Sequence, residues 1–157
     1  MPKVTGLGHV GIYVTDLATM VDFYGNFLGM TVTDRSDRIV FLSARPDVEH
    51  HEFALLHDPS RHSDAQQISF TVATLADLRE FHAQIENRAL PIDRVVTHGN
   101  AFGCYFRDPE NNQVEVYWHT GKDWPQPYAE PLDLTLSEPE LMALLDEMPP
   151  VATASAN

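Results

Sequence analysis

The chain has 157 residues, 43% of them hydrophobic, which fits one domain or two small fused halves with a real core. Its formal net charge of −13 argues against binding to nucleic acid or anionic lipid, because both favour a basic surface. A single cysteine, Cys104, cannot form an internal disulfide, which fits a reducing compartment. The N-terminus resembles a strand rather than a signal peptide, and no apolar run approaches the roughly 18 residues that span a bilayer. We therefore expect a cytoplasmic protein.

The first half of the chain predicts one strand, one helix and three short strands. The run Leu7–Val14 is rich in β-branched and aromatic residues and predicts the first strand. Asp16 is a candidate N-cap for a helix whose apolar residues recur at helical spacing as far as Leu28, and Gly29 is a candidate stop signal. Short strands are then predicted at Thr31–Thr33, Arg38–Ser43 and His50–Leu56.

The same order of elements restarts in the second half. Gln67–Val72 predicts a strand, and Thr74 or Asp77 opens a helix that continues to Ala89. The sequence DPENN predicts a tight turn between the last two strands. These later strands are predicted at Ile92–Thr97, Phe102–Arg107 and Gln113–Trp118.

An internal repeat supports this order. With a shift of 58 residues, similar apolar residues coincide in the two halves: Ile12 with Phe70, Val14 with Val72, Leu17 with Leu75, and Phe23 with Phe81. A strand, a helix and three strands thus occur twice, which predicts two βαβββ modules. We place these modules at about residues 5–57 and 65–119, within a domain of residues 1–120.

The composition changes after Trp118. The following segment is rich in proline and predicts an extended arm over residues 121–157. Ser137 is a candidate cap for a short amphipathic helix, which Pro149 and Pro150 end, and the last residues predict a disordered tail. The arm packs either on its own domain or against a partner or the site.

Two polar residues occur within apolar strand patterns. Glu115 alternates with Val114 and Val116, so it faces the opposite side of its strand. Burying an unpaired carboxylate is costly, so Glu115 either faces solvent or binds a cation. His9 lies in a similar apolar context, where the ordinary interpretation is a core histidine bonded to backbone. As a pair in a duplicated fold, the two residues favour a shared metal ion.

The chain resembles the vicinal oxygen chelate superfamily in the segments GLGHVGIYVTDLATMVDFYGNFLGM, HHEFALL, QQISFTV and THGNAFGCYFRDPENNQVEVYW. This superfamily includes glyoxalase I, bleomycin- and fosfomycin-resistance proteins and type I extradiol dioxygenases. The similarity covers roughly Val4 to His119, and the middle segments look most like the extradiol branch, including its one-domain members. The resemblance implies an α+β fold in which two βαβββ modules form a cup-shaped, partly closed barrel around a metal site.

The resemblance also implies a set of metal ligands. His9 falls at the position of the family's first ligand, a histidine on the first strand of the first module. Glu115 falls at the position of the last ligand, a glutamate on the final strand. The middle ligand, on the first strand of the second module, is histidine in extradiol dioxygenases but Gln67 here. Glutamine is a ligand in glyoxalase I enzymes, which add a fourth ligand on the strand that here carries His51 and Glu52.

Three further residues match the catalytic pattern of the extradiol branch. His51 falls where that branch places its catalytic base, His98 where it places a histidine near oxygen or substrate, and Tyr105 where it places a tyrosine that touches the catecholate. Each residue alone is more simply a strand-end histidine, a turn histidine or a core tyrosine. All three together favour an active site.

The expected function is therefore a metal-dependent dioxygenase that cleaves a catechol-like aromatic in the extradiol manner, with Fe(II) as the expected metal and Mn(II) or Zn(II) as alternatives. Dioxygen and a small aromatic are the expected partners, and the resemblance implies a homodimer. A glyoxalase-like isomerase, lyase or hydrolase is the main alternative, since His51 could be a ligand instead of a base. A non-enzymatic ligand-binding member is a third, although that class generally lacks the metal residues.

Overall fold

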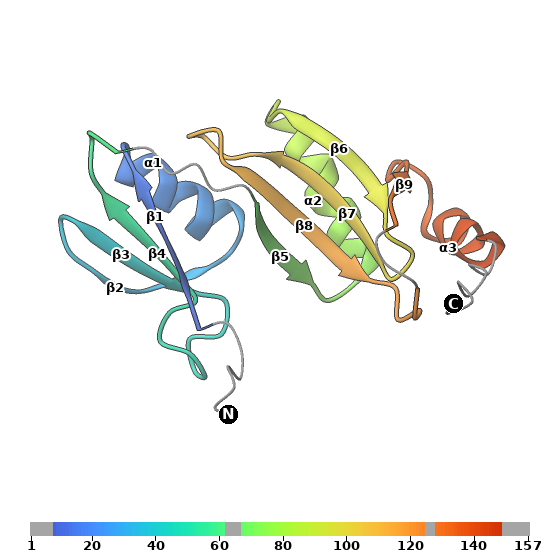
Figure 1. Cartoon of the computed structure of the whole chain (residues 1–157), viewed down its shortest axis with the longest axis horizontal. Helices are drawn as coiled ribbons and strands as arrows, with labels where there is room; N and C mark the ends of the chain where they lie inside the picture. The colour runs from blue at the N-terminus through green and yellow to red at the C-terminus, as the bar shows by residue number, and fades with distance from the viewer. Residues whose placement is uncertain (1–7, 62–66, 125–127, 149–157) are drawn as a thin grey trace, which may run out of the picture. The chain divides into compact units, whose positions relative to one another are not determined.

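The computed structural model describes residues 8–61, 67–124 and 128–148 (Figure 1). These described residues fall into two compact units, one from the stretches 1–66 and 108–112 and the other from 67–107 and 113–157. The predicted start of the first strand at Leu7 and the predicted disordered tail lie outside the described residues. No helix in the described part of the chain has the length and apolar character needed to cross a membrane.

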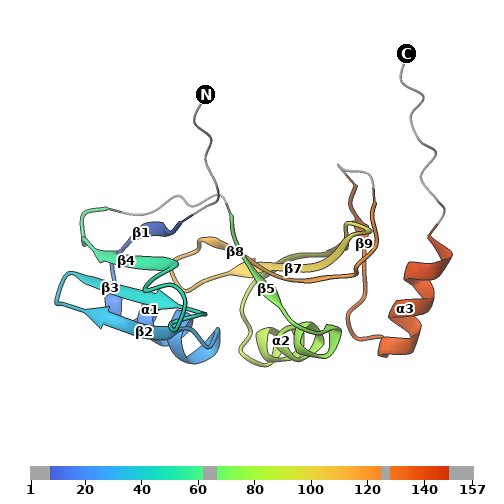
Figure 2. The same ribbon diagram turned by 90° about the horizontal axis from the view of Figure 1, so that it is seen from below.

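The first unit contains a four-stranded sheet with a helix on one face (Figure 2). The strand order is β1-β4-β3-β2, in which β1 and β4 are parallel and the other pairs are antiparallel. Its elements are β1 (Val10–Val14), α1 (Leu17–Val21), the π-helix η1 (Asp22–Phe27), β2 (Thr31–Arg35), β3 (Ile39–Ser43) and β4 (Phe53–His57).

The helix of the first unit begins and ends where the sequence predicts. The Asp16 side chain accepts a hydrogen bond from the Thr19 backbone N–H at 3.0 Å and caps α1. Gly29 has a φ of +78°, a left-handed conformation in which glycine costs least. The second half of the helix is π-helical, which the apolar spacing did not predict. Met20 and Tyr24 are buried on its inner side.

The second unit repeats this topology and extends it. Its sheet has the order β5-β8-β7-β6-β9, with β5 and β8 parallel. Thr74 and Asp77 form a reciprocal capping box at the start of α2. The elements are β5 (Ile68–Val72), α2 (Leu75–Asn87), β6 (Ile92–Thr97), β7 (Ala101–Arg107), β8 (Gln113–His119), β9 (Glu130–Pro131) and α3 (Glu138–Glu147).

The internal repeat is confirmed at the level of single residues. β1 covers residues 10–14 and β5 covers 68–72, and α1 and α2 begin at Leu17 and Leu75, so the shift is 58 residues at all these points. In each unit the first strand pairs in parallel with the last strand of its βαβββ module. The predicted α+β class with two such modules is therefore confirmed.

The C-terminal segment contributes one strand and one helix. β9 pairs with β6 through Val96 and Pro131. Ser137 caps α3 and forms a capping box with Glu140, as its position in the sequence predicts. Leu141 and Leu145 are buried, so α3 packs its apolar side inward.

Four predicted strands begin later than expected, and for β3 the difference is the single residue Arg38. The β1–β4 ladder begins with Val10 opposite Phe53, so His9 and His51 precede their strands. Similarly, β5 begins at Ile68, directly after Gln67. The first backbone hydrogen bond of the ladder runs from the Val10 N–H to the Glu52 carbonyl at 3.0 Å. His9, His51 and Gln67 therefore lie just before the strands in which they were predicted.

The DPENN turn between β7 and β8 belongs to the first unit. Glu110 Oε1 accepts hydrogen bonds from the backbone N–H groups of Thr15 and Asp16, both at 2.7 Å. The buried Tyr24 hydroxyl donates to Asp108 Oδ2 at 2.9 Å. Burial and the neighbouring Asp108 raise the pKa of Tyr24 well above its usual value, so this hydroxyl remains a donor. The turn is therefore an anchor for the start and the middle of the first helix.

Replacing Tyr24 by phenylalanine is expected to lower the free energy of unfolding by about 1–3 kcal/mol, because it leaves a buried carboxylate oxygen with one donor fewer. Urea unfolding followed by circular dichroism measures the effect. Tyr13→Phe is the matched control, since Tyr13 is only half-buried and should change the free energy little. Equal unfolding free energies for the Tyr24→Phe variant and the unchanged protein would contradict the anchoring role.

Candidate active site

Glu115 lies in the middle of β8 and is almost completely buried, with 6% of its surface exposed. Its Oε2 atom accepts hydrogen bonds from Ser69 Oγ at 2.6 Å and from Gln67 Nε2 at 3.0 Å. Ser69 is the direct neighbour of Glu115 on β5, and Tyr105 is its neighbour on β7. The structure therefore brings Gln67 and Glu115 together, as the predicted ligand set requires of the second unit.

The carboxylate of Glu115 has neutral neighbours. Within the described residues no lysine, arginine or histidine forms an ion pair with it. Buried carboxylates are normally paired with a cation, because the loss of water around the charge is costly. The buried Glu115 carboxylate, which has no cationic side chain as partner in the described stretches, therefore fits a divalent cation.

Gly103 provides the space that Glu115 occupies. A Cβ atom at this position on β7 would lie 2.6 Å from Glu115 Oε1 and 3.3 Å from Tyr105 Cε2. Such contacts are too close, so any larger residue would displace the carboxylate or the tyrosine ring. Sequence reasoning missed both Gly103 and Ser69, because their roles depend on which strands pair.

His98 and Tyr105 form a hydrogen-bonded pair next to Glu115. His98 Nε2 lies 3.0 Å from the Tyr105 hydroxyl, and His98 Nδ1 lies 2.7 Å from the backbone carbonyl of Tyr128. A carbonyl only accepts, so Nδ1 carries a proton. In the neutral ring, Nε2 is therefore an acceptor for the Tyr105 hydroxyl. The backbone carbonyl of Tyr128 thus determines which ring nitrogen of neutral His98 carries the proton.

The Tyr105 hydroxyl remains protonated at neutral pH. Burial is the largest cause that raises the pKa of Tyr105 to about 12, followed by the hydrogen bond and the charge of Glu115. The guanidinium of Arg94, whose Cζ lies 4.1 Å from the centre of the Tyr105 ring, opposes this shift only in part. Tyr105 is consequently a hydrogen-bond donor at the site.

Ser69, His98, Tyr105 and Glu115 line one cavity of the second unit, which has a volume of about 350 Å³. Tyr117 and Glu115 both line it, as expected for two residues that lie two positions apart on one strand. Asn100 and His119 also contribute to the wall, and the sequence had not singled them out. The cavity thus combines a carboxylate, a tyrosine hydroxyl and two imidazoles.

The first unit holds His9 and His51 side by side. Their ring centres lie 4.5 Å apart, and the His51 ring also packs on Phe41, with centres 4.4 Å apart. His50 Nδ1 lies 3.0 Å from His51 Nδ1, so one of these two nitrogens donates to the other. His9 is exposed and His51 half-buried, so both rings remain accessible to a ligand of this unit.

Glu52 is not free to act as a further ligand. Its carboxylate accepts hydrogen bonds from Arg45 Nη2 at 2.7 Å and from the Ala44 backbone N–H at 2.9 Å. Burial alone would raise the pKa of Glu52, but these hydrogen bonds and the charge of Arg45 outweigh it and lower the pKa below its usual value. Of the two candidates for a fourth ligand, His51 therefore remains.

The candidate residues fall into two groups, one in each unit: His9 with His51, and Gln67 and Glu115 with His98 and Tyr105. Among the described residues, no group of three or more histidine, cysteine, aspartate or glutamate side chains is arranged to hold a metal ion. The expected ligand set contains one histidine, His9, and one glutamate, Glu115. Its third member, Gln67, is an amide and does not belong to these four residue types.

Comparisons with known proteins identify the family. The model of the Glyoxalase/Bleomycin resistance protein/Dioxygenase superfamily matches residues 6–116. Biphenyl-2,3-diol 1,2-dioxygenase 3 of Rhodococcus globerulus is 29% identical over 118 residues, which cover 70% of this chain and 61% of that protein. The manganese-dependent 2,3-dihydroxybiphenyl 1,2-dioxygenase of Geobacillus genomosp. 3 is 23% identical over 123 residues, which cover 76% and 38%. The chain thus spans less than two thirds of the length of both relatives.

A similar fold is found in a solved structure. The lactoylglutathione lyase of Agrobacterium tumefaciens superimposes with a TM-score of 0.59 at 17% sequence identity, over 74% of this chain and 96% of that protein. At this identity the similarity establishes the fold and leaves the reaction open.

Proposed function

Because the chain belongs to the Glyoxalase/Bleomycin resistance protein/Dioxygenase superfamily, we propose that it is a metal-dependent dioxygenase that cleaves a catechol-like ring in the extradiol manner. The observation that carries the proposal is the buried Glu115 carboxylate, whose hydrogen-bond donors among the described residues include the neutral side chains of Ser69 and Gln67, and which lies beside the His98–Tyr105 pair. Such a carboxylate is suited to hold a divalent cation. The names of two relatives, both dioxygenases of aromatic diols, support the same chemistry.

The proposed ligands are His9, Gln67 and Glu115. Gln67 donates through its Nε2 atom to Ser69 and Glu115, so its carbonyl oxygen is the atom that would bind the metal. One imidazole, one amide oxygen and one carboxylate suit Fe(II) or Mn(II). We propose Fe(II), with Mn(II) as the alternative that the manganese-dependent relative supports.

The chain's own residues would handle protons around the bound substrate. A divalent ion in this set would supply sites for the catechol oxygens and dioxygen, and would lower the pKa of the catechol hydroxyls. His51 would accept a proton from the substrate as a general base. On substrate binding, the Tyr105 hydroxyl would turn its single proton from His98 Nε2 toward negative charge that develops on oxygen. His98 would orient that hydroxyl, and would itself donate through Nε2 only when its ring is protonated.

Gln67 favours a second candidate, a glyoxalase-like isomerase, lyase or hydrolase. An amide oxygen in place of an imidazole weakens the match to the dioxygenase set. His51, whose ring centre lies 4.5 Å from that of His9, would then be the fourth ligand. In that reaction dioxygen would not be consumed. The two candidates therefore differ in a quantity that is simple to measure.

The deciding experiment combines metal content and oxygen consumption. The protein is purified without oxygen, its bound metals are determined by elemental analysis, and an oxygen electrode follows turnover of a panel of catechols. Bound iron or manganese with oxygen uptake supports the proposed dioxygenase. Bound metal without oxygen uptake on any catechol supports the second candidate, and a protein that binds no divalent metal would be a ligand-binding member of the family.

Replacing Gln67 by histidine is expected to tighten Fe(II) binding about tenfold or more, because imidazole is a stronger donor to Fe(II) than an amide oxygen. Isothermal titration under anaerobic conditions measures the dissociation constant. Gln84→His is the matched control, because it makes the same substitution on α2, where no proposed ligand lies. An unchanged dissociation constant in Gln67→His would remove Gln67 from the ligand set.

A further inference from the structure

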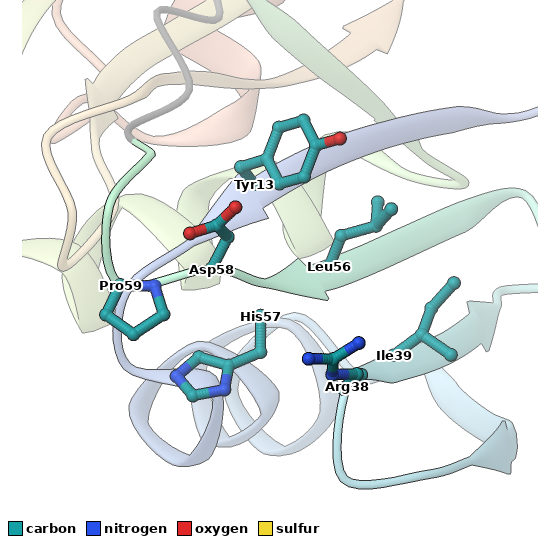
Figure 3. A pocket seen from close by; sticks show the side chains of 7 residues that line it. All are labelled: Tyr13, Arg38, Ile39, Leu56, His57, Asp58 and Pro59. Carbon is teal, nitrogen blue, oxygen red and sulfur yellow. The ribbon is translucent and has the colours of Figure 1, made fainter.

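The first unit contains a second cavity, of about 550 Å³, at the end of its sheet (Figure 3). Tyr13 lies opposite Leu56 in the β1–β4 ladder, and Leu56 lies opposite Ile39 in the β3–β4 ladder. These side chains form one apolar row across three strands, on the face away from the buried Ile12 and Val14. The cavity therefore has an apolar wall suited to a hydrocarbon or an aromatic ring.

The rim of this cavity is polar and carries unbalanced positive charge. Arg38 is fixed at its backbone, because its carbonyl accepts the His57 N–H at 2.8 Å. Its guanidinium forms no ion pair with any residue in the described stretches. In a chain with a net charge of −13, an arginine without an acidic partner beside a cavity is available for an anionic ligand.

Asp58 is the acidic member of the rim, and its charge is already compensated. Its carboxylate accepts hydrogen bonds from the Ser60 hydroxyl at 2.7 Å and backbone N–H at 3.0 Å, and lies 3.6 Å from Arg61 Nε. The Arg61 guanidinium also lies over the Tyr13 ring, with Cζ 4.7 Å from its centre. This contact disfavours a cationic ligand on that ring face. With Asp58 matched by Arg61, Arg38 remains to meet a negative group.

The cavity and His9 are connected along the chain by the start of β1. Gly11 and Tyr13 are two residues apart and face the same side of β1, and His9, which directly precedes β1, continues this spacing of two. Gly11 is exposed, and a Cβ atom there would lie 3.1 Å from Leu56 Cδ1, a close contact that glycine avoids. The four-residue step from His9 to Tyr13 corresponds to roughly 13 Å. A ligand bound at His9 would thus need a second ring or a long chain to reach Arg38.

We propose that the cavity of Tyr13, Leu56, Ile39 and Arg38 binds the far end of the substrate, and that this end is apolar and terminates in a carboxylate. The substrate class is then a catechol that carries an extended acidic substituent. The link to a catechol rests on the proposed function, whereas binding of the acidic end does not. Arg38 binds the carboxylate, and the apolar row contacts the carbon skeleton next to it.

The test measures the acidic end by itself. Isothermal titration compares 3-phenylpropionate with the neutral 3-phenylpropanol on the full chain. We expect the acid to bind at least about tenfold more tightly than the alcohol, and Arg38→Gln to abolish this difference, as the loss of a charge-assisted hydrogen bond requires. Arg35→Gln, a nearby exposed arginine of β2, is the control and should leave binding unchanged. Equal binding of acid and alcohol, or an unaltered preference in Arg38→Gln, would overturn the proposal.

Turnover separates this proposal from the proposed function. With catechols that carry a long carboxyalkyl substituent, Arg38→Gln should raise KM at least about tenfold and leave kcat and the KM for unsubstituted catechol unchanged. Oxygen uptake with an unchanged KM for the acidic catechol would contradict the cavity proposal alone. Selective binding of 3-phenylpropionate in a protein without oxygen uptake would instead contradict the dioxygenase proposal and leave the acid-binding cavity supported.

Discussion

Replacing Glu115 by alanine is expected to abolish binding of the divalent metal. Glu115 is the only charged group in the proposed ligand set, and its carboxylate is buried between Ser69 and Gln67. Loss of groups that merely orient a ligand already costs about 10–100-fold in metal affinity, so removal of the charged ligand should cost at least about 100-fold. Elemental analysis after anaerobic purification measures the occupancy, and isothermal titration measures the affinity.

Glu80→Ala provides the control for this variant. Glu80 is an exposed carboxylate on α2 of the same unit, where it accepts a hydrogen bond from Gln84. Its removal changes the net charge by the same amount and should leave the metal content unchanged. If Glu115→Ala retained the metal content of the unchanged protein while its circular dichroism spectrum showed a native fold, the proposed site would be wrong.

His51→Ala is expected to slow turnover about 100- to 10,000-fold while the metal content stays normal, because a positioned general base contributes a factor of this size. The His51 ring packs on Phe41 and lies beside His9, which places it next to a proposed ligand without requiring that it be one. The rate of oxygen uptake under saturating catechol measures the effect. His50→Ala, at the adjacent and exposed position, should slow turnover less than about tenfold.

The metal content of His51→Ala distinguishes the two candidate functions. A normal content with slow turnover supports His51 as a base. Loss of the metal would instead make His51 a fourth ligand, in a set with His9, Gln67 and Glu115, and would favour the glyoxalase-like reaction. Normal turnover with normal metal would exclude both roles.

Much of the fold follows from local signals in the sequence. The caps at Asp16, Thr74 and Ser137 and the stop at Gly29 depend on residues within one turn, so they can be identified without knowledge of the tertiary structure. The repeat shift of 58 residues also holds for the first strands and the first helical residues. The first residue of each strand was less predictable. β1 begins at Val10 because backbone pairing with β4 begins there, opposite Phe53.

The site was predictable in its polar residues and less so in its surroundings. The pattern around Glu115 revealed a carboxylate in an apolar strand, and its burial confirms that this position is unusual. The contributions of Ser69 and Gly103 arise from pairing between β5, β8 and β7, which no local pattern specifies. Ser69 had a usable signal, since it lies two residues after Gln67 on the same face of its strand. No local signal indicated that Glu52 is held by another residue, because its partner Arg45 lies seven residues away in the chain.

Anomalous diffraction from crystals grown anaerobically with Mn(II) tests the central claim most directly. That claim is that an imidazole of the first unit and a carboxylate of the second bind one ion. We expect a single strong anomalous peak within about 2.0–2.3 Å of both a His9 ring nitrogen and a Glu115 carboxylate oxygen, as in ordinary coordination bonds. A peak bound to only one of these residues, or to neither, would contradict the shared site.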